Sequence, residues 1–298
     1  MFDDKPEGPR FFIPYADQDI ALKGRRPIAQ PMISYLCDGI EHSDYQPGTD
    51  IDIRVWVANF GEFGRGIVDV WLIRPSTGLS MAGRTPIIAN LPVNVGPPAD
   101  DTVPETIRHR AEATDWTTIS IPSDADNHQC LIARVRSRLD EIPPLDRDQA
   151  QPGVNRHWAQ ENLSYQPAQA KVIHAIGFDA GNPIVEYQDF EIKVSPPDEG
   201  VIKRLIQRLD RGTYVDLDVE VSLGEHPEEL TGKNALVLSL EEQQIYPLFL
   251  NFMLHRELEP NTFGVLQVLQ RRMPTEKEKP DDPALIIGGI AVVVLPPK

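Results

Sequence analysis

The sequence predicts a mostly-β protein built from two tandem immunoglobulin-like β-sandwich domains, with an N-terminal arm and one short helix. Three observations support this class. Apolar and polar residues alternate with a period of two over many short stretches. Residues that favour turns separate these stretches at short intervals. Proline is abundant, with 28 in 298 residues, and because it interrupts helices, long helices are not expected.

The first domain is predicted over residues 31–183, after an arm at residues 1–30 that is rich in proline, aspartate and arginine. Its clearest strand is 51–57, where isoleucine and valine alternate with other residues. A second strand over 68–73 follows the turn-rich stretch N-F-G-E-F-G-R-G, so we expect these two strands to form an antiparallel pair. Further strands are expected at residues 117–121, 130–135, 163–166 and 172–178.

The second domain is predicted over residues 184–298. Val201, Leu205 and Leu209 recur with the spacing of one helical face, which predicts a short amphipathic helix over 201–209. Valine and leucine then alternate with acidic residues over 215–223, which predicts one strand with a single buried face. The remaining strands are expected at residues 190–194, 235–240, 248–254, 265–269 and 284–295.

Charge and hydropathy argue against two classes of partner. The chain has 29 basic and 45 acidic residues, a formal net charge of −16, which disfavours nucleic acid and anionic membrane surfaces. No apolar run reaches the ~20 residues of a membrane helix.

The first residues lack the basic start and apolar core of a signal peptide. We therefore expect synthesis in the cytoplasm, with export only as part of a larger exported or particle-associated complex.

The sequence offers no recognisable metal, cofactor or catalytic motif. Cys37 and Cys130 do not have zinc-ligand spacing. Whether they pair as a disulfide stays open, and two reduced, half-buried thiols in a reducing compartment are the favoured interpretation. The seven histidines are scattered singly. The acidic row Asp216, Asp218 and Glu220 fits either a weak Ca²⁺ site or, more commonly, a solvated strand face. A non-enzymatic protein is expected, although an active site assembled only in three dimensions would escape this reading.

Two groups of residues are candidates for contacts with a partner. Phe11, Phe12 and Tyr15 lie on the arm, where extended chain can pack on a neighbour. His157 and Trp158 lie in the distinctive string N-R-H-W-A-Q-E-N-L at residues 155–163. Each of these residues fits a core position equally well, and the string also fits a structural loop whose amides satisfy backbone groups.

Several strings resemble bacterial CARDB-like, immunoglobulin-type β-sandwich domains. They are I-R-V-W-V-A-N-F-G at 53–61, V-D-V-W-L-I-R-P at 68–75, residues 116–122, C-L-I-A-R-V at 130–135, and the string at 155–163. The resemblance covers roughly residues 15–180. It implies an interaction module without catalytic residues.

The expected function is therefore a non-enzymatic interaction or structural subunit of a larger bacterial or phage-like assembly, such as a contractile injection system. Its partners would be other protein subunits, including copies of itself, bound through edge strands, the arm and loops. The alternative is a carbohydrate-binding accessory module in which Trp56, Trp71 or Trp116 stacks on sugar rings.

Overall fold

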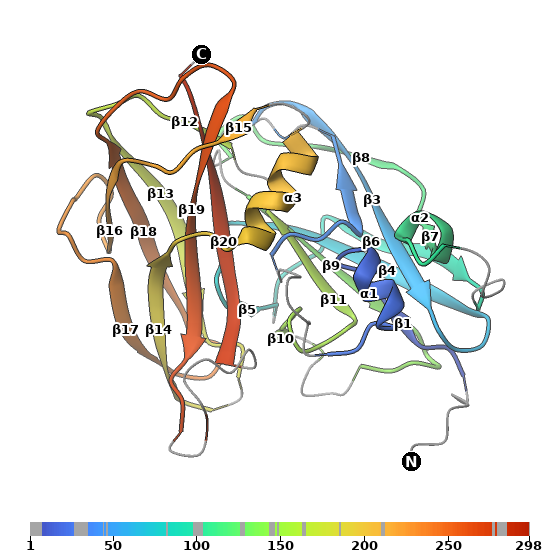
Figure 1. Ribbon diagram of the computed structural model, residues 1–298. Helices are drawn as coiled ribbons and strands as arrows, with labels where there is room; N and C mark the ends of the chain where they lie inside the picture. Colours follow the sequence, from blue (N-terminus) through green and yellow to red (C-terminus); the bar gives the residue numbers. More distant parts are fainter. Residues whose placement is uncertain are drawn as a thin grey trace. The chain divides into compact units, whose positions relative to one another are not determined.

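A computed structural model of the chain confirms the mostly-β class (Figure 1). The structure describes residues 8–26, 35–43, 45, 47–81, 83–97, 104–125, 129–142, 147, 149–162, 165–184, 186–209, 212–275, 278 and 285–297. Parts of the predicted arm and of the strands predicted at 163–166 and 284–295 lie outside these residues.

The chain divides into two compact units. Unit 1 comprises Met1–Ile73, Met81–Ala125 and Leu131–Glu161, and unit 2 comprises Arg74–Ser80, Asp126–Cys130 and Asn162–Lys298. The main division thus lies near residue 161 and not near 183 as the sequence suggested. The reason is that β13 (Ile173–Gly181) pairs along its whole length with β18 (Ile245–Leu254), which ties it to unit 2.

The first sheet of unit 1 is built around β3 (Asp50–Asn59), the strand that the sequence predicted most clearly. Its inward side chains, Ile51, Ile53 and Val55 among them, are fully buried. Four short strands pair with it: β1 (Phe11–Phe12), β2 (Ile40–His42), β7 (Ala111–Ala113) and β8 (Thr117–Ser120).

The second sheet of unit 1 has the strand order β11–β9–β4–β6. Its strands are β4 (Gly64–Ile73), β6 (Ile88–Val95), β9 (Cys130–Arg136) and β11 (Trp158–Asn162). The expected pairing of the strands at 51–57 and 68–73 is therefore wrong, because β3 and β4 lie in different sheets. The string at 155–163 contains a buried strand, β11, in place of the loop that the sequence also allowed.

One asparagine holds the crossing from β3 to β4. Asn59 is 1% exposed. Its Oδ1 accepts a hydrogen bond from the backbone amide of Gly61 (2.9 Å), and its Nδ2 donates to the carbonyl oxygens of Glu62 (2.7 Å) and Val95 (3.0 Å). A Cβ at Gly61 would lie 2.1 Å from the Gly8 carbonyl oxygen. We call this connection between the two sheets an arch. The Asn59 side chain satisfies backbone groups that a hairpin would pair with each other, so the chain crosses between sheets instead of forming a hairpin.

The described part of the predicted arm packs into unit 1. Phe12 and Ile20 form a buried cluster with Ala58, Ile107 and Ala111 on the second face of β3. Two short helices, α1 (Asp17–Ala21) and α2 (Ile107–Arg110), contribute to this cluster. Residues 8–26 thus pack on unit 1 with most of their apolar side chains buried, in place of forming a free arm, because β3 is apolar on both faces near its end and needs this cover.

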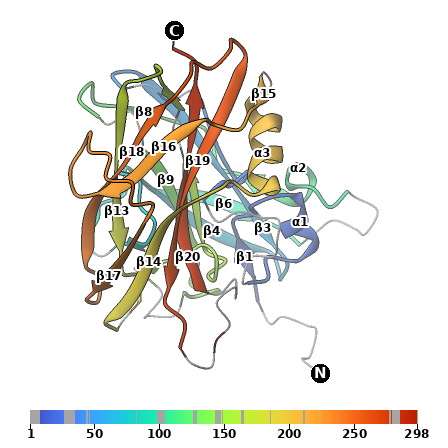
Figure 2. The ribbon, with the colours of Figure 1, turned by 60° about the vertical axis from the view of Figure 1, so that its left-hand side comes forward.

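Unit 2 is a second sandwich, whose long strands are visible in Figure 2. One sheet has the order β12–β20–β19–β14–β17, with β15 beside β19, and the other has the order β13–β18–β16. The strands not yet bounded are β12 (Tyr165–Pro167), β14 (Gln188–Ser195), β15 (Thr213–Tyr214), β16 (Val219–Gly224), β17 (Ala235–Leu240), β19 (Thr262–Arg272) and β20 (Ile286–Leu295). Two further strands have two residues each: β5 (Leu79–Ser80) belongs to unit 2 and β10 (Gln149–Ala150) to unit 1.

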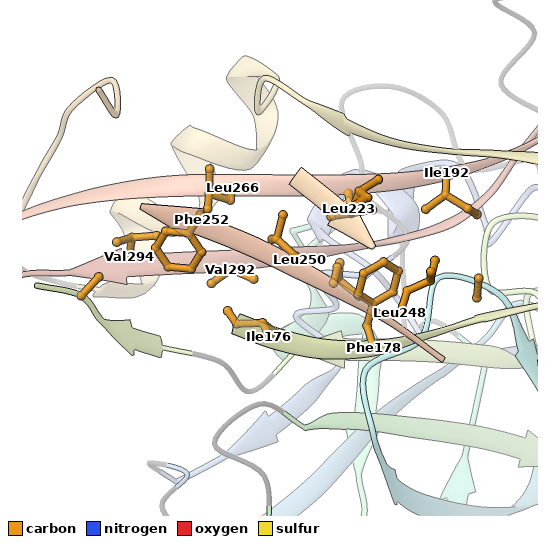
Figure 3. Packing of buried hydrophobic residues seen from close by; sticks show 14 of the residues in the cluster. Ile176, Phe178, Ile192, Leu223, Leu248, Leu250, Phe252, Leu266, Val292 and Val294 are labelled. Atoms are coloured by element: carbon orange, nitrogen blue, oxygen red, sulfur yellow. The ribbon is translucent and has the colours of Figure 1, made fainter. Parts of the chain in front are cut away.

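The core of unit 2 lies between these two sheets. Phe178, Leu250 and Phe252 are fully buried, and so are Val292 and Val294 of the facing sheet. Figure 3 shows Phe252 beside Val294, and Leu250 near Val292. Such interdigitation of apolar side chains is what stabilises a sandwich.

Residues 74–80 belong to unit 2 although their neighbours in the sequence belong to unit 1. Ser76 forms an isolated bridge with Asp179, and the hydroxyl of Thr77 donates to Oε1 of Gln270 (2.6 Å). Gln270 is itself fully buried. These polar contacts bind the segment to β13 and β19.

The helix predicted at 201–209 is confirmed as α3 (Glu199–Leu209). Val201 and Leu205 are buried, as their spacing indicated. Among the described residues, no helix has the length and hydropathy needed to cross a membrane.

Of the strand predicted over 215–223, only the part from residue 219 onward is a strand, and residues 215–218 are not. Residues 213–214 form β15 beside β19, whereas residues 219–224 form β16 beside β18 in the other sheet. Leu217 lies between them and packs on the core so closely that a Cβ at Gly264 would lie 2.1 Å from its Cδ2. The alternation of apolar and polar residues continues through the point where the chain crosses from one sheet to the other. The alternation alone therefore does not reveal the crossing.

Candidate functional site

The structure corrects the expectation that five aromatic and histidine side chains contact a partner. Phe11, Phe12, Tyr15 and Trp158 are completely buried, and His157 is 3% exposed. Their ring surfaces are used by the core of unit 1. Only His157 lines a hollow of the surface.

Tyr15 is an internal anchor. Its hydroxyl oxygen accepts a hydrogen bond from the backbone amide of Gln160 (2.9 Å), and its own amide donates to the Asp19 carboxylate (3.1 Å). Burial raises the pKa of Tyr15 well above its ordinary value. Arg26 neutralises the fully buried Asp19 through two hydrogen bonds, of 2.9 and 3.2 Å. The ordering of this segment thus depends on an internal ion pair.

A second carboxylate, that of Asp140, has a 9% exposed side chain and organises the string at 155–163. It accepts hydrogen bonds from the Phe11 amide (2.7 Å), from Nη2 of Arg156 (2.6 Å) and from Nε2 of His157 (3.2 Å). Burial alone would raise the pKa of Asp140, but the hydrogen bond from His157 and the charge of Arg156 hold it below its usual value. The carboxylate therefore stays ionised and fixes both side chains.

The geometry of His157 does not suit proton transfer. Nε2 faces the Asp140 carboxylate, and Nδ1 faces Oδ1 of Asn155 (3.1 Å). That oxygen also accepts the His157 amide (3.0 Å), which establishes it as an acceptor. With both ring nitrogens directed at acceptors, neither is available to take a proton from a nucleophile.

These residues form the wall of a hollow that we name the cationic pocket. It has a volume of about 540 Å³. The basic residues that line it are Arg10, Lys23, Arg25, Arg26, Arg156 and His157. Glu141 is its only acidic lining residue among those the structure describes.

The end of α1 directs three of these cations into the pocket. Lys23 and Gly24 both have positive φ, 56° and 63°, which ends the helix. A Cβ at Gly24 would lie 2.5 Å from the Phe12 ring, so glycine is required there. The run K-G-R-R at 23–26 therefore turns sharply and places its basic side chains together.

The pocket carries an excess of positive charge. Arg10, Lys23 and Arg25 are exposed, and within the described part of the chain none of them has a carboxylate partner. Burial, together with the charges of Arg10 and Arg26, lowers the pKa of the Arg156 guanidinium, although Asp140 opposes this change. An anion bound here would relieve this mutual repulsion.

The tryptophans proposed for sugar stacking differ in accessibility. Trp71 is 3% exposed and packs against Trp158, with ring centroids 5.6 Å apart. The Trp56 ring is covered by Arg54 and Arg108, each 5.0 Å from its centroid. Trp116 is 50% exposed, with Arg54 over its ring at 4.4 Å. Of the four tryptophans, Trp116 alone exposes a large ring surface.

Metal and disulfide chemistry find no support in the described residues. No group of three histidine, cysteine, aspartate or glutamate side chains is placed to hold a metal ion there. Asp216 accepts a hydrogen bond from Tyr214 (2.9 Å), and Asp218 lies 3.9 Å from Arg256. Cys37 and Cys130 are both buried and unbridged.

Sequence reasoning found His157 but missed the cations around it. The run K-G-R-R was a usable signal, because it concentrates three basic residues in an acidic chain. Arg10, Arg156 and Asp140 gave no such signal. These three residues come close together in the fold because β1 pairs with β3 and because Phe11 forms hydrogen bonds with residues far away in the sequence.

No protein-family model matches the sequence, and no curated protein is similar to it at a significant level. Among solved structures, a proposed carbohydrate binding protein from Bacteroides ovatus is similar with TM-score 0.31 and 7% identity, over 45% of this chain and 35% of that one. A C. elegans MSP family member has TM-score 0.20 and 12% identity, over 44% and 89%. Red sea bream transglutaminase has TM-score 0.20 and 13% identity, over 86% and 31%. The chain thus spans about a third of the length of the Bacteroides protein.

The fold and the pocket together define the class of this protein. It is a β-sandwich protein of two units, and unit 1 has a basic hollow in its surface.

Proposed function

We propose that the protein is a non-enzymatic interaction subunit that holds an anionic group of its partner, a carboxylate or a phosphate, in the cationic pocket. The observation that carries this proposal is the group of exposed cations, Arg10, Lys23 and Arg25, beside half-buried Arg156 in a chain of net charge −16. Such a group of cations creates a local positive field that attracts an anionic group and offers it charge-assisted hydrogen bonds.

The surroundings of His157 support a binding role in place of a catalytic one. Its two nitrogens are directed at acceptors, so His157 contributes a hydrogen-bonded ring to the pocket wall and the described lining is mainly basic. The resemblance to CARDB-like interaction domains agrees with this role, and we extend it to a subunit of a larger bacterial or phage-like assembly.

Calorimetric titration with inorganic phosphate and with succinate tests the pocket. We expect saturable binding that weakens with added salt, because exposed charges are screened. The variant Lys23→Gln/Arg25→Gln should lose at least about tenfold in affinity, since it removes two of the charges while leaving the Asp140 network intact.

Lys233→Gln is the matched control, because Lys233 is an exposed cation of unit 2 outside the pocket. It should bind as the wild type does. The proposal is overturned if neither anion binds at about 10 mM, or if both variants bind like the wild type.

A second candidate function rests on Trp116. One face of its ring is open, so it offers a platform for a sugar ring. Quenching of tryptophan fluorescence by a glycan panel, lost in Trp116→Ala, would support a carbohydrate-binding module. An unchanged spectrum across the panel would reject it.

A further inference from the structure

A second basic hollow lies on the outer face of the sheet β11–β9–β4–β6, and it goes beyond the proposed function. We name it the arginine groove, and its volume is about 790 Å³. The arginines that line it are Arg65, Arg134, Arg136, Arg138 and Arg147. Glu141 is the only acidic residue among the described residues that line it.

The floor of the groove is built around one buried carboxylate. Asp69 on β4 accepts hydrogen bonds from Nε of Arg136 (2.8 Å), from Nη2 of Arg134 (3.1 Å) and from the Asn90 amide (3.0 Å). Burial alone would raise the pKa of Asp69, but these hydrogen bonds lower it. One negative charge is thus shared by two arginines, so the floor itself keeps a positive charge.

The guanidinium group of Arg134 is held in place by two tryptophan rings and one backbone carbonyl oxygen. Its guanidinium lies 5.1 Å from the centroid of Trp71 and 5.2 Å from that of Trp158. Its Nη1 donates to the carbonyl oxygen of Arg147 (3.0 Å). Stacking on two aromatic rings fixes the guanidinium plane before any ligand arrives. The buried Trp158, predicted as a contact residue, therefore supports the groove from inside.

The rim carries charges that no described carboxylate neutralises. Arg65, Arg138 and Arg147 are exposed, and in the described part of the chain none of them pairs with a carboxylate. With five arginines against Asp69 and Glu141, the groove has a formal charge of +3, in a protein of net charge −16.

The lining also contains aliphatic side chains. They are Ile67, Leu139 and Ile142, and Leu139 is 72% exposed. Apolar groups beside cations suit a peptide that has both acidic and aliphatic side chains. A sulfated saccharide would leave them uncovered, and the buried Trp71 and Trp158 offer no ring for a nucleic-acid base.

We infer that the arginine groove binds an acidic, leucine-containing peptide segment of a partner protein. Charge complementarity supplies most of the attraction, and Leu139 with its aliphatic neighbours supplies contacts for the apolar side chains. The arginine groove shares Glu141 with the cationic pocket but none of its basic residues, so either proposal can fail without the other.

The test uses the full chain and a fluorescein-labelled ten-residue peptide of glutamate, serine and two leucines, followed by fluorescence anisotropy. One control peptide has glutamine in place of glutamate, and another has serine in place of leucine. We expect saturable binding of the first peptide, no binding of the glutamine peptide, and at least about threefold weaker binding of the leucine-free peptide.

Variants then locate the site. Arg65→Ser/Arg138→Ser should weaken binding at least about tenfold, because it removes two exposed cations and leaves the Asp69 floor intact. Lys23→Gln/Arg25→Gln, which alters the cationic pocket, should bind the peptide as the wild type does.

Two results would overturn the inference. The first is that the acidic peptide fails to bind, or binds the groove variant as tightly as the wild type. The second is that a heparin oligosaccharide binds more tightly than the peptide and is insensitive to Leu139→Ser, which would make the groove a saccharide site.

Discussion

Two largely buried aspartate side chains, Asp69 and Asp140, organise the polar residues around both hollows of unit 1. Each accepts hydrogen bonds from two basic side chains and from one backbone amide. A buried charge is tolerated only when it is paired and hydrogen-bonded in this way. Each carboxylate fixes at least one arginine that lies beside other basic residues without a described carboxylate partner. The two aspartates therefore both stabilise the fold and position the basic residues of the candidate sites.

Replacing Asp140 tests its structural weight. Asp140→Asn should lower the free energy of unfolding of unit 1 by about 2 kcal/mol, because Arg156, the His157 ring and the Phe11 amide lose a charged acceptor. Urea unfolding followed by tryptophan fluorescence measures this loss, since all four tryptophans belong to unit 1. Asp124→Asn, at an exposed aspartate, is the control and should change little.

The same variant should alter the dependence of stability on pH. The pKa of Asp140 is lowered in the folded state, so its contribution is complete above the pKa of the unfolded chain and is lost as the pH falls through the folded-state pKa. Wild-type stability should therefore fall below about pH 4. Asp140→Asn should show a shallower fall, and an identical pH profile would contradict this account.

The cysteines permit a simple residue-scale prediction. Cys37 and Cys130 are buried and unbridged, so both should resist iodoacetamide in the folded protein and both should react in denaturant without reductant. Mass spectrometry counts the alkylated thiols. Two unreactive cysteines in denaturant would instead indicate a disulfide.

At the scale of elements, the two units repeat one device. Asn182, between β13 and β14, is fully buried. Its Oδ1 accepts the Ile184 amide (2.8 Å), and its Nδ2 donates to the carbonyl oxygens of Glu186 (2.7 Å) and Leu240 (3.0 Å). This matches the pattern at Asn59, and both asparagines lie where the chain crosses between sheets.

The strand orders extend this repeat. Reading from β11, unit 1 has β11–β9–β4–β6, and unit 2 has β20–β19–β14–β17 within its larger sheet. In each unit the last strand of the order ends at the carbonyl that the arch asparagine binds. The two sandwiches are therefore structurally related, although no repeat is visible in the sequence.

Each arch can be tested in its own unit. Asn59→Ala and Asn182→Ala should each cost about 2 kcal/mol or more, because buried carbonyl oxygens lose their donor. Tryptophan fluorescence follows unit 1 and far-ultraviolet circular dichroism follows both units. Asn94→Ala is the control, since Asn94 is an exposed residue of β6. Equal stability of arch and control variants would show that the arch is dispensable.

Element prediction succeeded where the pattern is local. Strands β3, β9 and β14 and helix α3 lie close to their predicted positions, because their buried faces recur with a period that the sequence displays. It failed at 215–223 and at the pairing of β3 with β4. In both places the chain passes from one sheet to the other, and this depends on partners distant in the sequence.

At the scale of the whole molecule, charge is distributed unevenly. The chain has a net charge of −16, yet both described hollows of unit 1 are lined by arginine. Repulsion from the acidic remainder disfavours long polyanions, whereas a short anionic group can enter a basic hollow.

One edge strand suits assembly. β17 (Ala235–Leu240) lies at the end of its sheet and pairs, among the described strands, with β14 alone. Its sequence A-L-V-L-S-L has no charge or proline, and Val237 is 63% exposed. Edge strands of proteins that stay monomeric usually carry a charged residue or a proline, which opposes pairing with a strand of another chain.

We therefore predict oligomers well above 33.4 kDa in size-exclusion chromatography with light scattering. Val237→Lys should shift the protein toward monomer, because a charge on an edge strand opposes strand pairing. Ile206→Lys, on the exposed side of α3, should leave the oligomer unchanged. A monomer at every concentration would reject self-assembly and leave binding to other proteins as the function.

The sequence by itself determined the mostly-β class, most strands and the single amphipathic helix, because alternation and helical spacing are local consequences of burying one face. It also indicated an acidic chain without a recognisable catalytic motif. Only the tertiary structure decided which sheet each strand joins, that Phe11, Phe12, Tyr15 and Trp158 are core, and that arginines from separate strands and loops line two hollows. Those outcomes depend on contacts between residues far apart in the chain, such as that of Asp140 with Phe11, and no local pattern encodes them.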